Sequence, residues 1–141
     1  MASYTVVEDT LWVMGGADAN HVYQSTQVVR HGQPTRWGPN LPEIGAFHCA
    51  TTLQDNSVIL TGGMTLRNRF SGSARTEIYN STTKRWERKA DMRHGRHSHS
   101  CTNVWLDPNP HSFGWPVIAM TMADTSVLSV VVAGGKGGRS F

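Results

Sequence analysis

Charged residues and cysteines are scarce in this sequence, and it has no long apolar run. Asp, Glu, Lys and Arg make up 16% of the 141 residues, and the formal net charge of +3 is too small by itself to indicate binding to nucleic acid. No stretch is apolar over the length that a membrane-spanning helix needs, and the chain start lacks the pattern of a secretory signal. We therefore expect no membrane span and no nucleic-acid partner, with a cytoplasmic location by default or an extracellular one if the sequence is an excerpt.

The two cysteines are too few to define a disulfide framework. Cys49 follows His48 by one residue, whereas Cys101 follows His99 by two. If both segments are strands, side chains alternate between faces, and this difference sends the two sulfurs to opposite faces. We therefore predict two free, mostly buried thiols and no disulfide between them.

Short apolar segments separated by polar or glycine-rich turns predict β-strands. Four such segments follow one another, joined by a polar turn, a double glycine with an Arg-rich loop, and a second polar turn. The predicted strands are near 47–53, 57–63, 76–80 and 85–88. Four consecutive strands joined in this way form one antiparallel meander.

The same features return about every 50 residues, which is typical of a repeat architecture. Each copy has a double glycine after its second strand, and most copies have a histidine before the first strand and a tryptophan in the fourth. The double glycine recurs after 47 residues, the tryptophan after 49 and the histidine after 51. The recurring residues are Gly15, Gly16, Gly62, Gly63, Gly134, Gly135, Trp37, Trp86, His48 and His99.

These residues resemble the kelch repeat. That family's pattern has an Arg and a His before the first strand, a double Gly closing the second, an aromatic in the third, and a Trp in the fourth that is followed by Met or Leu and Pro. Apart from the Pro, the pattern is supplied here by Arg96, His99, Gly62, Gly63, Tyr79, Trp86 and Met92. Three positions depart from it: Gly45 replaces the Arg, Val29 the aromatic and Arg93 the Pro.

The resemblance implies an all-β fold built from four-stranded antiparallel meander blades of a kelch-type β-propeller. The blades are expected at about 1–43, 44–93 and 94–141. A propeller closes with roughly 4 to 8 blades, so this chain is expected to be incomplete and not to close alone. We interpret it as an excerpt or a truncated product, with self-association of fragments as the alternative.

Residues 104–125 break the period, because 21 extra residues separate the histidine from the double glycine of the third copy. The segment contains Trp105, Phe113 and Trp115. Apolar aromatics on an irregular loop predict a binding lid. An unspliced or misassembled segment is an equally good interpretation.

A cluster of histidines next to a cysteine raises the question of a metal site. His97, His99 and Cys101 alternate, so they would share one strand face. The repeat accounts for His99 without a metal, so we expect no metal and no cofactor. Because the spacing indicates neither a Ser/His/Asp set nor paired carboxylates, we expect no catalytic residue and no enzymatic activity.

The resemblance implies a non-enzymatic protein–protein interaction module. Kelch propellers recruit partners to ubiquitin ligases, to the cytoskeleton or to cell-surface assemblies. The alternative is a fragment of a propeller enzyme, such as a galactose-oxidase-like or sugar-processing protein, whose missing blades would carry the site.

Positive charge is expected on one edge of the second sheet. In a meander, the loop between strands two and three emerges at the same edge as the loop that leaves strand four. A cationic face with an aromatic anchor suits an acidic peptide, although a solvated rim that maintains solubility explains the same charges. The predicted partner-binding residues are Arg67, Arg69, Phe70, Arg88 and Arg93.

The segment Asn80-Ser81-Thr82 fits the acceptor sequence for N-linked glycosylation. It also fits a plain turn between the third and fourth strands. We interpret it as a turn unless the parent protein is secreted.

Overall fold

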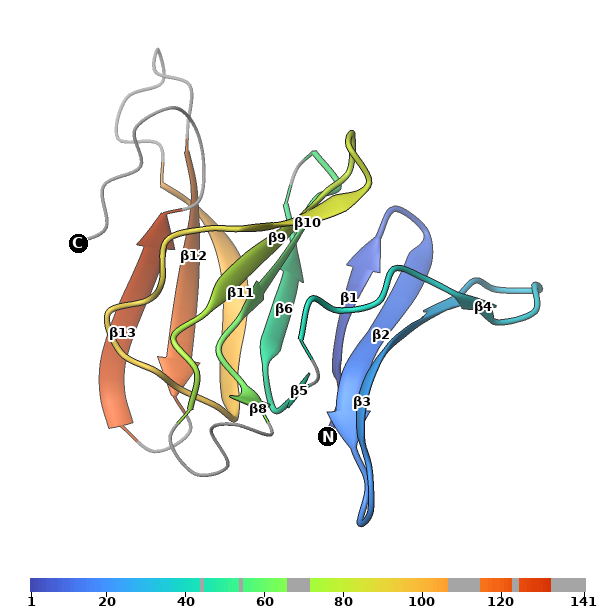
Figure 1. Ribbon diagram of the computed structural model, residues 1–141. Coiled ribbons are helices and arrows are strands. Elements are labelled where there is room, and N and C mark those ends of the chain that lie inside the picture. The colour runs from blue at the N-terminus through green and yellow to red at the C-terminus, as the bar shows by residue number, and fades with distance from the viewer. Residues whose placement is uncertain (44, 54, 66–71, 107–114, 123–124, 133–141) are drawn as a thin grey trace.

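The protein consists of antiparallel β-sheets, as its computed structural model shows (Figure 1). The structure describes residues 1–43, 45–53, 55–65, 72–106, 115–122 and 125–132, with side chains through residue 102. No helix occurs among these residues, so the prediction of an all-β fold is confirmed. None of this part of the chain forms a helix that could cross a membrane.

Two four-stranded meanders and a three-stranded sheet make up the fold, with one small two-stranded sheet between them. The first sheet has the order β1 (Ser3–Val7), β2 (Thr10–Ala17), β3 (Val22–Val29) and β4 (Arg36–Trp37). The second runs through β6 (Cys49–Thr52), β7 (Val58–Thr61), β9 (Thr76–Asn80) and β10 (Arg85–Arg88). The small sheet pairs β5 (Gly45–Ala46) with β8 (Met64–Thr65). The third sheet contains β11 (His99–Leu106), β12 (Trp115–Met122) and β13 (Thr125–Val132).

The second sheet is the meander that the sequence predicts. All four predicted strands are present, shortened by at most two residues at either end, and each pairs antiparallel with the next in chain order. A similar sheet precedes it in the chain, which is also as predicted.

The third sheet differs from the sequence prediction. Residues 104–125 were expected to form an irregular insertion, but β12 occupies Trp115–Met122 and pairs with β11 along its whole length. Trp105 and Trp115 therefore lie in strands and not on a lid, while Phe113 lies outside the described residues. The reason is that β12 is rich in apolar and β-branched residues, which favour strand pairing over a loop.

As a result, β13 pairs with β12 and not with the strand that begins at His99. The apolar strand before the third double glycine was expected to be the direct partner of that strand. Gly134 and Gly135 themselves lie outside the described residues.

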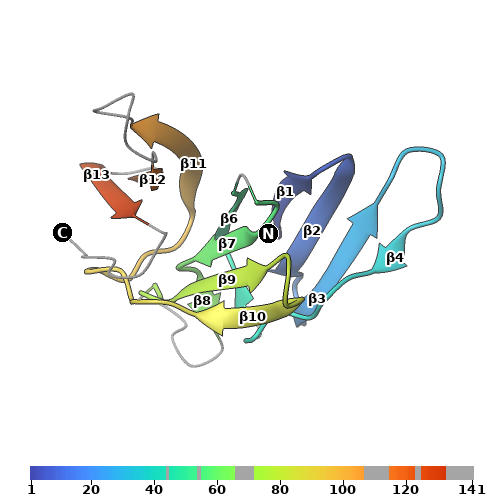
Figure 2. The ribbon, with the colours of Figure 1, turned by 90° about the horizontal axis from the view of Figure 1, so that it is seen from above.

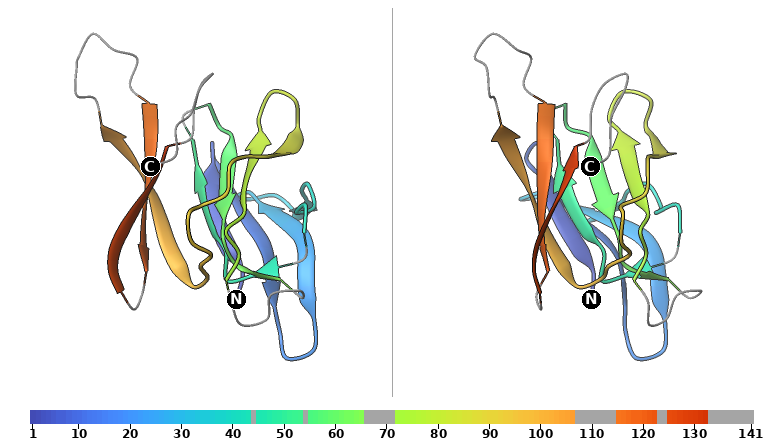
Figure 3. Two further views of the ribbon diagram at one scale, coloured as in Figure 1. Left: turned by 60° about the vertical axis from the view of Figure 1, so that its left-hand side comes forward. Right: turned by 90° about the vertical axis from the view of Figure 1, so that its left-hand side faces the viewer.

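The second sheet lies between the other two (Figures 2 and 3). Its side chains alternate, so Ala50, Val58 and Tyr79 share one face, and Ile59 and Ile78 share the other. The first of these faces packs against the first sheet, in a cluster of buried residues: Met14, Leu41, Ala50, Val58, Leu60 and Tyr79. The opposite face packs around Ile59 and Met92 and contacts Cys101 of β11.

Aromatic rings fill the contact between the first two sheets. The ring of Tyr79 lies 5.3 Å from that of Trp12 on β2 and 5.5 Å from that of Trp86 on β10, measured between centroids. Both arrangements are tilted or edge-on, as aromatic pairs prefer. Trp86, one of the recurring tryptophans, thus covers apolar surface between two sheets.

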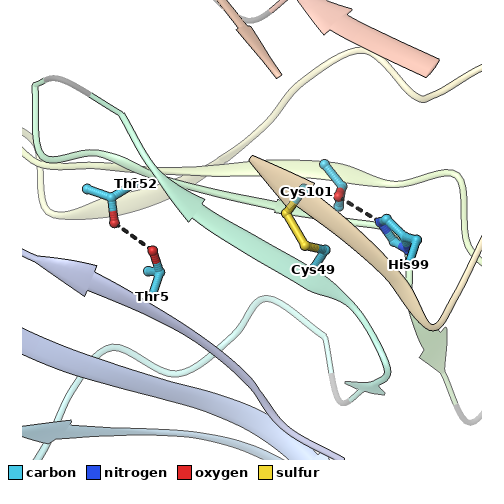
Figure 4. The surroundings of a disulfide bond; sticks show 6 residues. Thr5, Cys49, Thr52, His99 and Cys101 are labelled. Atoms are coloured by element: carbon cyan, nitrogen blue, oxygen red, sulfur yellow. Dashed lines mark hydrogen bonds between the residues drawn. A yellow bond between two sulfur atoms is a disulfide. The ribbon is translucent and has the colours of Figure 1, made fainter. Parts of the chain in front are cut away.

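A disulfide joins Cys49 of β6 to Cys101 of β11 (Figure 4), so the prediction of two free thiols is wrong. The alternation argument itself holds, because the two cysteines lie on opposite faces when the two sheets are compared repeat by repeat. In the stacked sheets, however, the face of the second sheet that carries Cys49 packs against the face of the third sheet that carries Cys101, so the two sulfurs meet. Closing a loop of 52 residues corresponds to about 4 kcal/mol of stabilisation in the chain-entropy description.

The outer face of the first sheet is apolar and uncovered in this chain. Tyr4, Val13, Gln27 and Trp37 lie in one row across the strands, so three of the four residues in the row are apolar or aromatic. Tyr4 is 70% exposed and Trp37 73% exposed, and Val6 on the same face is 55% exposed. The recurring tryptophan at position 37 therefore covers no neighbouring sheet, in contrast to Trp86.

We predict that this face drives self-association of the isolated chain, because water is excluded when two such faces meet. Replacing Tyr4 and Trp37 together with Ser should shift the sedimentation velocity profile from oligomers towards monomer. Arg85→Ser, which changes an exposed residue of the second sheet, serves as the control and should leave the profile unchanged. A monomeric parent chain would contradict the prediction.

Candidate functional site

The recurring histidine of each sheet packs against the recurring glycine of the sheet before it. A Cβ atom placed on Gly15 would lie 2.9 Å from Nε2 of His48 and 2.8 Å from the carbonyl oxygen of Gly45. One period later, a Cβ on Gly62 would lie 2.6 Å from Cε1 of His99. Both glycines have positive φ, +56° and +66°, which also favours glycine. The same histidine–glycine contact between adjacent sheets thus recurs once per repeat.

The residue before each of these histidines also repeats its backbone conformation. Phe47 and Ser98 have positive φ of 59° and 53°, although neither is a glycine. The amide of Ser98 donates a hydrogen bond of 2.8 Å to the carbonyl oxygen of Phe47. This bond joins the two equivalent turns, so each turn both delivers a histidine and links neighbouring sheets.

We predict that Gly62→Ala destabilises the fold much more than Gly32→Ala. Gly32 also has positive φ (+70°) but has no atom within 4 Å of an added Cβ, so its substitution measures backbone strain alone, about 1 kcal/mol. At Gly62 the methyl group also meets the carbonyl oxygen of Arg96 at 2.5 Å, which raises the loss to about 3 kcal/mol. Urea unfolding of the two variants measures the difference. Equal losses would show that the close contact does not matter.

Burial keeps both histidines neutral. His48 is 8% exposed, and neither ring nitrogen has a hydrogen-bond partner among the described residues. Nε2 of His99 lies 3.0 Å from the hydroxyl of Thr61 (Figure 4). Loss of solvation lowers the pKa of His48 to about 4, and loss of solvation together with the charge of Arg96 lowers the pKa of His99 to about 4.

We predict that acid destabilises the protein from about pH 6.5 downwards. An unfolded histidine binds a proton near pH 6.5, whereas these two bind one only near pH 4 when folded. Unfolding therefore takes up protons between these values, and each histidine lowers the free energy of unfolding by about 1.4 kcal/mol per pH unit. The loss is complete below about pH 4, and stability is full above pH 6.5.

Urea titrations between pH 7.5 and 5 measure this slope. His48→Gln should reduce the slope by the share of one histidine. His31→Gln, at an exposed position, should leave the slope of the parent chain. All variants have the same carboxylates, so comparing their slopes removes the carboxylate contribution to the pH dependence of stability. An unchanged slope in His48→Gln would contradict the prediction.

The loop that precedes β9 and the loop that leaves β10 lie side by side, at one edge of the second sheet. Ser73 and Arg96 form a β-bridge, and the amide of Arg96 donates to the carbonyl oxygen of Ser73 at 3.0 Å. The amide of Met92 donates to the carbonyl oxygen of Ala74 at 2.8 Å. The backbone thus holds residues 72–75 and 92–96 together as one surface, which we call the loop edge.

Most described cations near the loop edge are paired with acids. Arg75 forms ion pairs with Glu43 and with the buried Glu77. Arg88 pairs with Asp91 at 2.6 Å and approaches Glu77 at 4.0 Å. Glu43 and Glu77 lie outside the two loops that suggest a cationic face, so their pairs with Arg75 reduce the uncompensated positive charge among the described residues of this region.

The predicted partner-binding residues fall into three groups. Arg88 is exposed but paired, as described above. Arg93 is exposed and makes no ion pair with any residue in the described part of the chain. Arg67, Arg69 and Phe70 lie outside the described residues. Arg96 is only 4% exposed, so it belongs to the interior of the repeat and not to the cationic surface.

The described residues offer few side chains for a metal site or for a protein radical. No group of three or more His, Cys, Asp or Glu within the described ranges could hold a metal ion. Both cysteines are oxidised in the disulfide, so Cys101 is not available to the histidine cluster. Neither cysteine has a free thiol for the bond to tyrosine that the galactose-oxidase-like alternative would require. Tyr79 is buried between aromatic rings, and Tyr23 donates to Asp18 at 2.6 Å.

Of the two acids that pair with Arg75, only Glu77 has a signal in the sequence. Arg75 and Glu77 are two residues apart in an extended segment, and this spacing is a usable signal for an ion pair on one face. Glu43 has no such signal, because it comes from the connection between the first and second sheets.

The chain matches no protein-family model and no curated protein.

Proposed function

We propose that this chain is part of a kelch-type β-propeller that acts as a non-enzymatic protein–protein interaction module. The two meanders with the same strand order, and the histidine–glycine contact that recurs between sheets, support successive blades. The blades correspond to about 1–43, 44–93 and the part of 94–141 described above. Partners of the kind that ubiquitin-ligase, cytoskeletal or cell-surface assemblies supply fit such a module.

The uncovered face of the first sheet supports the propeller. It corresponds in the repeat to the face of the second sheet that carries Ala50 and Tyr79, and this face is covered by the first sheet. In a closed ring, a preceding blade would cover Tyr4 and Trp37 in the same way.

The binding surface in this proposal is the loop edge. The observation that carries it is the backbone bridge between Ser73 and Arg96, because it joins two loops far apart in sequence into one platform. Arg93 is exposed on this platform, and the segment with Arg67, Arg69 and Phe70 directly precedes residue 72. Since Arg binds carboxylates with two parallel hydrogen bonds and Phe offers an apolar anchor, an acidic peptide fits best.

We predict that reversing the charges of three arginines on or next to the loop edge weakens binding of acidic peptides. The variant changes Arg67, Arg69 and Arg93 to Glu, and its matched control is Arg85→Glu, an exposed arginine at the opposite end of β10. Fluorescence anisotropy with a labelled peptide rich in Asp and Glu should show Kd raised at least ~10-fold in the variant and unchanged in the control. Binding to the parent chain should also weaken as salt rises.

The same experiment tests the solvated-rim interpretation. If the parent chain does not bind the peptide, or if affinity depends neither on these arginines nor on salt, the arginines serve only solubility. Phe70→Ala adds a separate test of the apolar anchor, because it removes the ring without changing the charge.

A further inference from the structure

The β9–β10 hairpin carries a modification sequence at its turn. Asn80 ends β9, and Ser81 and Thr82 follow in the turn (Figure 1). The sequence contains no other Asn-x-Ser or Asn-x-Thr segment. Thr82 is exposed, as are the two residues after it, so the hydroxyl that an acceptor sequence needs lies at the surface.

The side chain of Asn80 is oriented by its carbonyl end. Oδ1 accepts hydrogen bonds from the amides of Thr82 at 2.9 Å and Thr83 at 3.0 Å. Nδ2, the atom that carries a glycan, donates to the partly exposed carboxylate of Glu87 at 3.0 Å. An N-glycosylated amide keeps one N–H, so a sugar on Nδ2 is compatible with this contact and with both turn hydrogen bonds.

An independent observation indicates the compartment. Cys49 and Cys101 form a disulfide between two sheets, and structural disulfides form and persist in oxidising surroundings such as the secretory pathway and the cell exterior. N-linked glycosylation takes place in the same pathway. The disulfide therefore changes the meaning of the sequence at Asn80, which would be a plain turn in a cytosolic protein.

We propose that Asn80 is an N-glycosylation site and that the chain matures in the oxidising secretory pathway. In the transfer, Nδ2 of Asn80 forms a bond to C1 of the first sugar of a pyrophosphate-linked lipid oligosaccharide. The bond between C1 and the pyrophosphate oxygen breaks, Nδ2 loses one proton, and the lipid pyrophosphate leaves. The glycan projects from the exposed end of the β9–β10 hairpin, away from the loop edge at the other end of the second sheet.

The first test uses the natural protein, captured with an antibody to this chain and digested with trypsin without reduction. Peptide 76–84 contains Asn80 as its only acceptor. It should carry an N-glycan, and enzymatic release of the glycan should convert Asn80 to Asp. Peptides 37–67 and 97–136 should be joined through the two cysteines. A natural protein whose peptide 76–84 is unmodified overturns the proposal, whatever the state of its cysteines.

The second test uses the full chain behind a cleavable secretion leader in cultured animal cells, with both lysate and medium analysed. The parent chain and Thr82→Ser, which keeps the acceptor sequence, should lose apparent mass on treatment with an N-glycan amidase. Thr82→Ala should show no loss. This variant is preferable to Asn80→Gln, because it leaves the hydrogen bonds of Asn80 in place. If the parent chain also shows no loss, or if Thr82→Ala still shows one, the assignment to Asn80 is wrong.

Discussion

The packing of an uncharged imidazole against a bare glycine backbone is the constraint on which the arrangement of the sheets depends. At Gly62 there is no room for a methyl group between its own strand and the ring of His99. The ring is buried, so it must be neutral in the folded protein. The same turn supplies Arg96, whose backbone accepts from Gly63 and donates to Ser73. One contact therefore sets both the stacking of the sheets and the position of the loop edge.

The repeat made much of the fold predictable. Period-2 alternation, double glycines and polar turns placed the four strands of the second sheet within two residues of their observed ends. The disulfide was not predictable by the same reasoning, because alternation assigns a face within one sheet and says nothing of which faces meet. The prediction for the third sheet was wrong for another reason. The pattern fixed the period but could not show that Trp115–Met122 pairs as a strand inside the extra segment.

The candidate site was less predictable than the fold. Meander topology was sufficient to bring the two loops to one edge, because loop position follows from strand direction. The net charge of that edge could not be predicted in the same way, because ion pairs also involve acids from outside the two loops. Glu43 reaches Arg75 across the boundary between sheets, and Glu77 reaches it along the strand. Counting charges in a loop therefore gives an upper bound on the charge that a partner meets.

The two contacts between sheets are stabilised by different means. Between the first and second sheets, six buried residues form one apolar cluster, and the partly buried rings of Trp12 and Trp86 pack against it. Between the second and third sheets, the described side chains form a cluster with only two buried residues, Ile59 and Met92, and the disulfide lies beside it. A covalent bond adds to apolar packing, because it lowers the entropy of the unfolded chain without needing buried area. Reduction of the disulfide would remove this covalent link, so the contact between the second and third sheets is the one that depends on oxidised cysteines.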